Sequence, residues 1–250
     1  MRKPVMAGNW KMYKTPAETT AFFEKFLPLV ASSTHCEIVI APPFIDIPAA
    51  IAAAGHSRVE IGAQNLHYVT KEGAFTGEIS GPMLTAAGAK WVIIGHSERR
   101  QFFHETDETV LKRTVAALES GLKPIVCVGE QLAERDAGVT ADVLATQFAK
   151  GIEALTPEQF AKIVIAYEPV WAIGTGKTAT PDLAADAHRI LRNLVANRWG
   201  ADTAQAVRIL YGGSVKPDNV KGLMAQPEID GALVGGASLD PAGFSAIVNF

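Results

Sequence analysis

The chain has 250 residues, of which 48% are hydrophobic and 20% are charged, and its formal net charge is −3. This composition is typical of a globular protein with a large core, and the charge gives no reason to expect nucleic acid or an acidic membrane as a partner. Two cysteines, Cys36 and Cys127, are too few for a disulfide framework or a metal cluster. The sequence shows neither a membrane-spanning stretch nor a signal-peptide core, so we expect a cytoplasmic protein.

Eight short apolar runs, rich in β-branched residues, recur along the chain. They are VMAG (5–8), EIVIA (37–41), VEIGA (59–63), WVIIG (91–95), PIVCV (124–128), IVIAY (163–167), RILY (208–211) and GALVG (231–235). Such runs are typical of parallel strands buried on both faces, and the intervals between them leave room for crossover helices. We therefore predict an α/β fold in which residues 1–250 form a single (β/α)8 TIM barrel domain, with eight parallel strands surrounded by helices.

Helix start signals lie between these runs. The capping box Thr15-Pro16-Ala17-Glu18 predicts a helix that Pro28 should end. The interval after the second run predicts a short Ala-rich helix. Further helices are predicted from start signals at Thr106, Thr156 and Thr180 and from the spacing of apolar residues over 140–155. An open, doubly wound sheet is the alternative fold. It usually has a G-x-G-x-x-G turn after the first strand, whereas this chain has Asn9-Trp10-Lys11.

Two predicted strand ends carry side chains suited to acid–base chemistry. Glu168 follows the sixth run and precedes Pro169, and His96 follows the fourth run. The carboxyl ends of barrel strands meet at one rim, so we expect both side chains at the same mouth. A helix beginning just after His96 would disfavour a protonated ring and leave a neutral hydrogen-bond donor. Taken alone, each residue is also explained by a structural role, as an ion pair or as a histidine bonded to a backbone carbonyl.

Other strand ends are suited to binding an anion. Lys11, two residues beyond Asn9, would attract an anionic substrate and stabilise oxyanion charge, although a solvated surface lysine fits this position as well. Backbone N–H groups after strands seven and eight, with a helix N-terminus behind them, form the usual phosphate site of such barrels. Glycine-rich tips follow the last three runs, at Gly174-Thr175-Gly176, Gly212-Gly213-Ser214 and Gly235-Gly236.

Several motifs resemble those of the triosephosphate isomerase family and occur in the same order. They are G-N-W-K-M (8–12), G-A-F-T-G-E (73–78), G-H-S-E-R-R (95–100), A-Y-E-P-V-W-A-I-G-T-G-K (166–177), Y-G-G-S-V (211–215) and L-V-G-G-A-S-L (233–239). The likeness runs from Val5 to Leu239. It implies an isomerase of glycolysis and gluconeogenesis that interconverts dihydroxyacetone phosphate and glyceraldehyde 3-phosphate by proton transfer through an enediolate, without a metal or organic cofactor.

The resemblance also implies roles for individual residues. Glu168 is expected to be the base that moves a proton between C1 and C2 of the triose phosphate. His96 is expected to be the neutral electrophile that moves protons between the oxygens on these two carbons. Lys11 and Asn9 are expected beside the oxyanion, and Glu98 is expected to orient a neighbour. The phosphate-binding positions implied by the family are Gly174, Ser214, Gly235 and Gly236.

Residues 169–179 are expected to close over the substrate as a lid. One hinge would be Pro169, Val170 and Trp171, and the other Lys177, Thr178 and Ala179. Between them lie Ala172, Ile173, Gly174, Thr175 and Gly176.

The resemblance further implies a symmetric homodimer. Residues 64–81 are long for a loop after a barrel strand, and an exposed Phe75 beside Thr76 would suit insertion into a partner. A loop folded on its own barrel is the alternative. Tyr13 and Lys14 replace an Asn-Gly pair frequent in the family, and Leu66 stands where a cysteine is common; both departures lie near the expected contact.

Two other functions fit the same scaffold. A Schiff-base aldolase would need a desolvated lysine inside the barrel. A sugar-phosphate-binding barrel that has lost catalysis would keep the anion site, although the presence of both Glu168 and His96 disfavours it.

Overall fold

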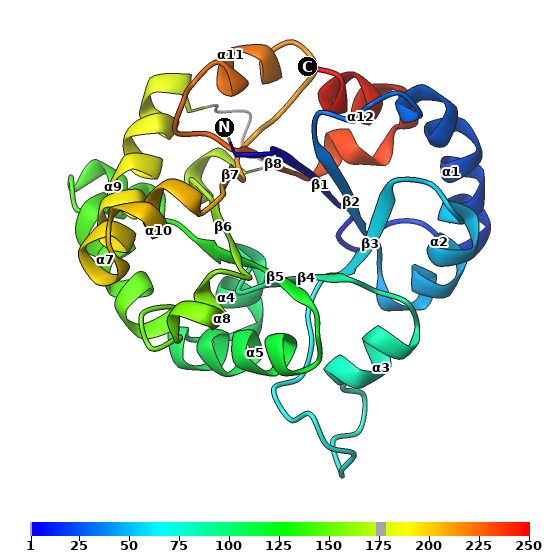
Figure 1. Ribbon diagram of the computed structural model, residues 1–250, viewed down its shortest axis with the longest axis horizontal. Coiled ribbons are helices and arrows are strands. Elements are labelled where there is room, and N and C mark those ends of the chain that lie inside the picture. The colour runs from blue at the N-terminus through cyan, green and yellow to red at the C-terminus, as the bar shows by residue number, and fades with distance from the viewer. Residues whose placement is uncertain (1, 174–178) are drawn as a thin grey trace.

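The computed structural model describes residues 2–173 and 179–250, which form a closed barrel of eight parallel strands inside a ring of helices (Figure 1). The predicted fold class is confirmed. Each strand pairs with the next one in the chain, and β1 pairs with β8 to close the barrel. The strands are β1 (Val5–Asn9), β2 (Glu37–Ala41), β3 (Val59–Ala63), β4 (Trp91–Ile94), β5 (Lys123–Val128), β6 (Val164–Tyr167), β7 (Ile209–Tyr211) and β8 (Gly231–Val234).

Alternate residues of each strand face opposite sides of the barrel wall. In β5, for example, Ile125 and Cys127 belong to a cluster made only of strand residues, which therefore fills the barrel interior. Val126 and Val128 belong to the larger cluster that also contains helix residues. The apolar runs are thus continuous because both faces of every strand are buried.

The helices lie outside the strands (Figure 1). They are α1 (Pro16–Val30), α2 (Ile47–Ala54), α3 (Gly81–Ala86), α4 (Ser97–Phe103), α5 (Asp107–Glu119), α6 (Leu132–Asp136), α7 (Thr140–Gly151), α8 (Pro157–Phe160), α9 (Pro181–Trp199), α10 (Ala201–Ala206), α11 (Val220–Met224) and α12 (Pro241–Val248). Short 3₁₀ turns are η1 (Phe44–Asp46), η2 (Val170–Ala172) and η3 (Gly236–Leu239). Within residues 2–173 and 179–250, no helix is long and apolar enough to cross a membrane.

The predicted helix starts at Thr15, Thr106, Thr156 and Thr180 are confirmed, because each threonine hydroxyl accepts a backbone N–H from the first turn. The predicted stop at Pro28 is wrong, since α1 continues to Val30. Pro28 lies in the last turn, where its missing N–H costs a single bond, and burial of Phe26 and Val30 keeps that turn on the core. The helix predicted over 140–155 ends earlier, at Gly151.

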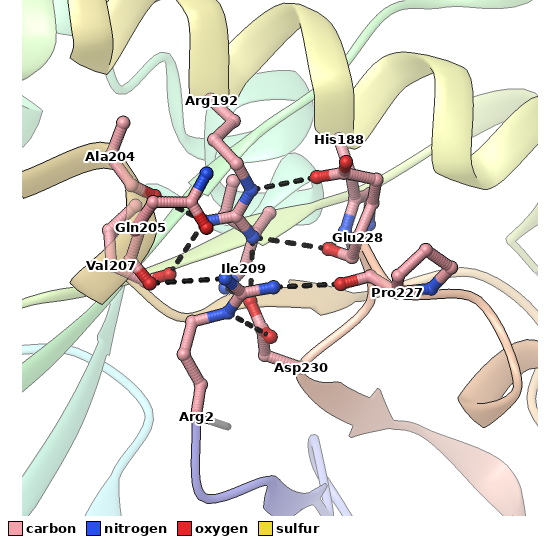
Figure 2. A network of polar contacts seen from close by, with 10 residues as sticks. All are labelled: Arg2, His188, Arg192, Ala204, Gln205, Val207, Ile209, Pro227, Glu228 and Asp230. Carbon is pink, nitrogen blue, oxygen red and sulfur yellow. Dashed lines mark hydrogen bonds and ion pairs between the residues drawn. The ribbon is translucent and has the colours of Figure 1, made fainter. Parts of the chain in front are cut away.

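At the amino ends of β7, β8 and β1, a buried ion network ties the barrel together (Figure 2). Arg192 of α9 donates five hydrogen bonds, including one to Asp230 Oδ2 at 2.9 Å. Arg2 reaches the other oxygen of Asp230 at 2.5 Å, and the N–H of Ile209 donates to Oδ2 at 2.8 Å. The carboxylate of Asp230, just before β8, therefore bonds to the segment before β1 and to the start of β7.

Candidate active site

The carboxyl ends of the strands surround a cavity of about 270 Å³. Asn9 ends β1, and His96 follows β4 after the turn at Gly95, which has a positive φ of 69°. The cavity lining brings together Asn9, Lys11 and His96 with the tips after β7 and β8, including Ser214, Gly235 and Gly236. The structure thus gathers at one mouth most of the residues that the sequence singled out, from segments far apart in the chain.

Glu168 follows β6 and is 1% exposed. The N–H of Ser97 donates to its Oε2 at 2.9 Å, and its Oε1 lies 2.9 Å from Nε2 of His96, although these last two atoms are not aligned as a hydrogen bond. Burial raises the pKa of Glu168, but the His96 ring and the Ser97 N–H lower it by more, so the carboxylate is ionised.

The carboxylate of Glu168 is turned away from the main cavity. It lines a separate cavity of about 210 Å³ behind the rim, together with Ser97, Arg100 and Gly129. Close packing on its other side depends on Gly212, where an added Cβ would lie 2.8 Å from Cγ of Glu168. The side chain therefore has to rotate before it reaches a molecule bound beside His96.

His96 is the N-cap residue of α4, so a helix does begin immediately after it. The backbone N–H of Glu98 donates to its Nδ1 at 3.2 Å, which leaves the ring hydrogen on Nε2 in the neutral form. Burial lowers the pKa of His96, and the adjacent Glu168 carboxylate raises it by more, so the net direction is upward. The neutrality of the ring during reaction remains a prediction that depends on Glu168 moving away.

Lys11 adopts a left-handed backbone with φ of 52°, and its N–H donates to Oδ1 of Asn9 at 3.0 Å. This local turn directs the side chain across the mouth, where Nζ lies 2.5 Å from Oε1 of Glu98. The second oxygen of Glu98 lies 3.7 Å from Nδ1 of His96. Glu98 therefore lies between the lysine and the histidine.

The segment expected to be the lid begins with residues that are anchored to Glu130. Val170 donates its N–H to the Glu130 carbonyl at 3.1 Å, and the Trp171 indole donates to Oε1 of Glu130 at 2.9 Å. Ala172 is buried within η2 and Ile173 lines the main cavity. Of the residues expected to form the second hinge, the structure describes only Ala179, which is buried. Five of the expected lid residues lie outside the described part of the chain, namely Gly174, Thr175, Gly176, Lys177 and Thr178.

Three contributions to this site were missed at the level of sequence. The Ser97 N–H and the Arg100 guanidinium belong to a motif that we had noted, but only helix geometry shows where they point. Glu130 is fully buried and bonds both Tyr167 and Trp171. A signal for Glu130 existed, because it stands with Gly129 immediately after the fifth apolar run.

The segment between β3 and α3 projects away from the barrel (Figure 1, cyan). Phe75 is 45% exposed on it, and Thr76 is also exposed.

A second cavity, of about 470 Å³, lies next to the main one and shares Asn9, Lys11 and His96 with it. Its lining includes the exposed side chains of Met12, Tyr13, Phe44 and Phe103.

No group of three or more His, Cys, Asp or Glu side chains suited to holding a metal ion occurs among the described residues. The cavity has a different character. Its polar lining residues are Asn9, His96, Ser214 and two lysines, Lys11 and Lys216, together with the glycine-rich turns. Such a lining suits a small anionic molecule whose oxygens accept hydrogen bonds.

Comparison with known proteins agrees with this geometry. The family model for triosephosphate isomerase matches residues 4–250. A protein named triosephosphate isomerase from Solibacter usitatus is 71% identical over 250 residues, which cover all of both chains. One from Citrifermentans bemidjiense is 56% identical over 250 residues, which cover all of this chain and 99% of the relative. One from Caldanaerobacter subterraneus subsp. tengcongensis is 52% identical over the full length of both chains. The chain therefore belongs to the triosephosphate isomerase family.

Proposed function

We propose that this protein interconverts dihydroxyacetone phosphate and D-glyceraldehyde 3-phosphate by proton transfer through an enediolate. The observation that carries the proposal is the meeting of Glu168 and His96, 2.9 Å apart, at the edge of a cavity that also contains Lys11. A hydrogen α to a carbonyl is weakly acidic, so its removal needs a placed base and donors for the oxygen that gains charge.

Glu168 is the proposed base. Its carboxylate is ionised and almost free of contact with bulk water, which leaves it able to take a proton from carbon. Reaction begins when the side chain leaves the Ser97 N–H and rotates into the main cavity. It then removes the proton from C1 of dihydroxyacetone phosphate and returns it to C2. The reverse reaction uses the same steps in the opposite order.

His96, Lys11 and Asn9 are the proposed partners of the two reacting oxygens. The neutral ring of His96 donates from Nε2, and the departure of Glu168 removes the charge that raises its pKa. The Lys11 ammonium stabilises negative charge on the enediolate, and Asn9 fixes the turn from which it projects. Glu98 restrains Lys11 through the 2.5 Å contact.

The phosphate is proposed to bind at the opposite side of the cavity, on Ser214, Gly235 and Gly236, with Gly174 joining from outside the described residues. This is supported by the lining of the main cavity, which includes Ser214, Gly235 and Gly236, and by the start of η3 at Gly236. We further propose that residues 169–179 close over the bound molecule, with Trp171 and Glu130 at the first hinge.

We also propose that the protein is a homodimer in which the tip carrying Phe75 and Thr76 enters the 470 Å³ cavity of a second copy. The two features match, because the tip is apolar at Phe75 and the cavity is lined by exposed Met12 and Tyr13. Sedimentation of the wild type should show a dimer. Phe75→Asp should yield monomer, whereas Leu132→Asp, at an exposed leucine of α6, should not; a monomeric wild type would refute the proposal.

The proposed setting is the cytoplasm, which agrees with Cys36 and Cys127 being free thiols. One catalytic domain spanning residues 1–250 is proposed as well.

The alternative of a Schiff-base aldolase gains no support, since the buried side chains of the described segments include no lysine. Nothing in the described geometry favours a barrel that only binds its ligand.

A coupled isomerase assay in both directions tests the proposed function. The purified protein should convert either triose phosphate to the other, with added chelator making no difference. Borohydride treatment in the presence of dihydroxyacetone phosphate should leave the mass of the protein unchanged. Absence of isomerisation, with either ligand still protecting the protein against unfolding, would instead indicate a binding protein. A covalent adduct would indicate the aldolase.

A further inference from the structure

Arg100 lies in the last turn of α4 and makes three directed contacts. Its Nε donates to the Gly95 carbonyl at 2.8 Å, and one terminal nitrogen donates to the Cys127 carbonyl at 3.1 Å. The other terminal nitrogen pairs with Oδ1 of Asp107, the first residue of α5, at 2.6 Å. A single planar side chain thus joins the ends of β4 and β5 to the start of α5.

Both carbonyls belong to backbone that carries the reacting pair. Gly95 immediately precedes His96 and packs closely against α5, because an added Cβ would lie 2.6 Å from the Val110 side chain. Cys127 precedes Val128, whose carbonyl accepts the N–H of Glu168 at 2.8 Å. Arg100 therefore holds the backbone on both sides of the contact between His96 and Glu168.

Arg100 also contributes a positive charge behind the carboxylate. It shares the 210 Å³ cavity with Glu168 and with the side chain of Glu134 from α6. The other titratable groups that act on Glu168 are His96, which faces it directly, and the buried thiol of Cys127 in β5. The Arg100 charge lowers the pKa of Glu168, after the larger effects of burial, His96 and the Ser97 N–H.

We infer that Arg100 is a positioning residue for the isomerase reaction, which holds the backbone that carries His96, Ser97 and Glu168 and places a positive charge behind the carboxylate. The inference rests on the proposed role of Glu168. Arg100 does not line the main cavity and so acts through its neighbours. Its side chain is 19% exposed, so its positive charge is only partly screened by solvent.

The test compares Arg100→Met, which removes the bonds and the charge, with Arg100→Lys, which keeps the charge but cannot bond two carbonyls and a carboxylate in the same fork. Arg189→Met is the matched control, because Arg189 is exposed on α9 and pairs with Asp186 in its own helix. For each variant, kcat and KM are measured between about pH 5 and 9 and divided by the wild-type values. The ratio cancels the ionisation of the substrate phosphate.

Arg100→Met should lower kcat/KM about 10- to 100-fold at neutral pH, mostly through kcat, and the ratio should fall further as the pH decreases. The second effect follows because Glu168 protonates at a higher pH once the cation is gone. Arg100→Lys should lower kcat while its ratio stays nearly constant with pH. Arg189→Met should leave every ratio near one.

A purely structural role predicts a different result. Both Arg100 variants would then melt at lower temperature but keep kcat within about twofold of the wild type, with flat ratios, and the inference would be overturned. If Arg100→Met does not fold, the kcat of Arg100→Lys decides alone. An inactive wild type would refute the proposed function instead, so the two failures are distinct.

Discussion

Buried charges lie at both ends of this barrel, but they are used differently. At the amino ends of the strands, Arg192 has all five N–H groups bonded and Asp230 accepts from Arg2, Arg192 and the Ile209 N–H (Figure 2). At the carboxyl ends, Glu168 has one oxygen without an aligned hydrogen bond and lines the 210 Å³ cavity. The first arrangement has no capacity left for a ligand, whereas the second does.

This difference indicates that the charges at the amino ends stabilise the fold, whereas Glu168 at the carboxyl ends is available for chemistry. A buried ion pair whose hydrogen bonds are all made resists rearrangement, and breaking it leaves a charge uncompensated. A buried carboxylate with an unused oxygen and room to rotate is held less firmly, and it is therefore available to accept a proton. Changes at the two ends should accordingly affect different measurements.

The largest effect is expected for Glu168→Gln, which keeps the size of the side chain and removes the base. We predict that kcat falls by about 10²- to 10⁴-fold, in line with the usual contribution of a general base. The melting temperature should change little, because the amide still accepts from the Ser97 N–H. Initial rates and a thermal melt on the same sample check both parts. Activity within about tenfold of the wild type would assign the base elsewhere.

The next effect concerns the amino end. Arg192→Met should lower the free energy of unfolding by about 3–5 kcal/mol, because Asp230 loses one of its two arginine partners and the carbonyls of Ala204 and Val207 lose the Arg192 donor. The kcat of the molecules that remain folded should stay near the wild-type value. Urea unfolding and initial rates measure the two quantities, and Arg189→Met on the same helix is the control. A loss of kcat as large as that of Glu168→Gln would show that the charges at the amino ends of the strands also support catalysis, and would contradict the comparison.

A smaller effect involves pH. His188 beside the network is fully buried, its Nδ1 lies 3.1 Å from the Glu228 carbonyl, and burial lowers its pKa to about 3. Since the folded pKa lies below the ordinary value of 6.5, only the unfolded chain takes up this proton between those values. Stability is therefore complete above about pH 6.5 and declines as the pH falls towards 3.

His188→Asn keeps a donor near the position of Nδ1 and removes the titration. The slope of unfolding free energy against pH below about 6.5 should become flatter by at most about 1.4 kcal/mol per pH unit. Urea titrations at a series of pH values measure this slope. Equal slopes in the two proteins would show that His188 does not titrate on unfolding.

The fold and the mouth of the site could be predicted from sequence because their signals are local. Each strand is a continuous apolar run, and each reactive tip follows such a run directly, as Glu168 and His96 do. Boundaries were less predictable where tertiary burial outweighs a local rule. Pro28 did not end α1, since burial of its neighbours maintains the last turn.

The ion networks could not be predicted, because they join residues distant in the chain. Arg2 and Asp230 are 228 positions apart, and the bond from Arg100 to Cys127 depends on how α4 leaves the rim. The backbone of Lys14 could not be predicted either. Lys14 stands where the family frequently has a glycine, and it nevertheless adopts a left-handed backbone with φ of 77°. Its ammonium lies 5.3 Å from the ring centroids of both Trp10 and Phe22, contacts that offset part of that strain.

The central claim is that Glu168 carries hydrogen between two carbons as a proton. It is tested most directly by running the reaction from unlabelled dihydroxyacetone phosphate in D₂O and examining C2 of the glyceraldehyde 3-phosphate by proton NMR at low conversion. A carboxylic acid exchanges its proton with solvent, so our account predicts deuterium at C2 in a measurable share of the product. A product that contains only protium at C2 would indicate direct hydride transfer between the carbons and would contradict the account.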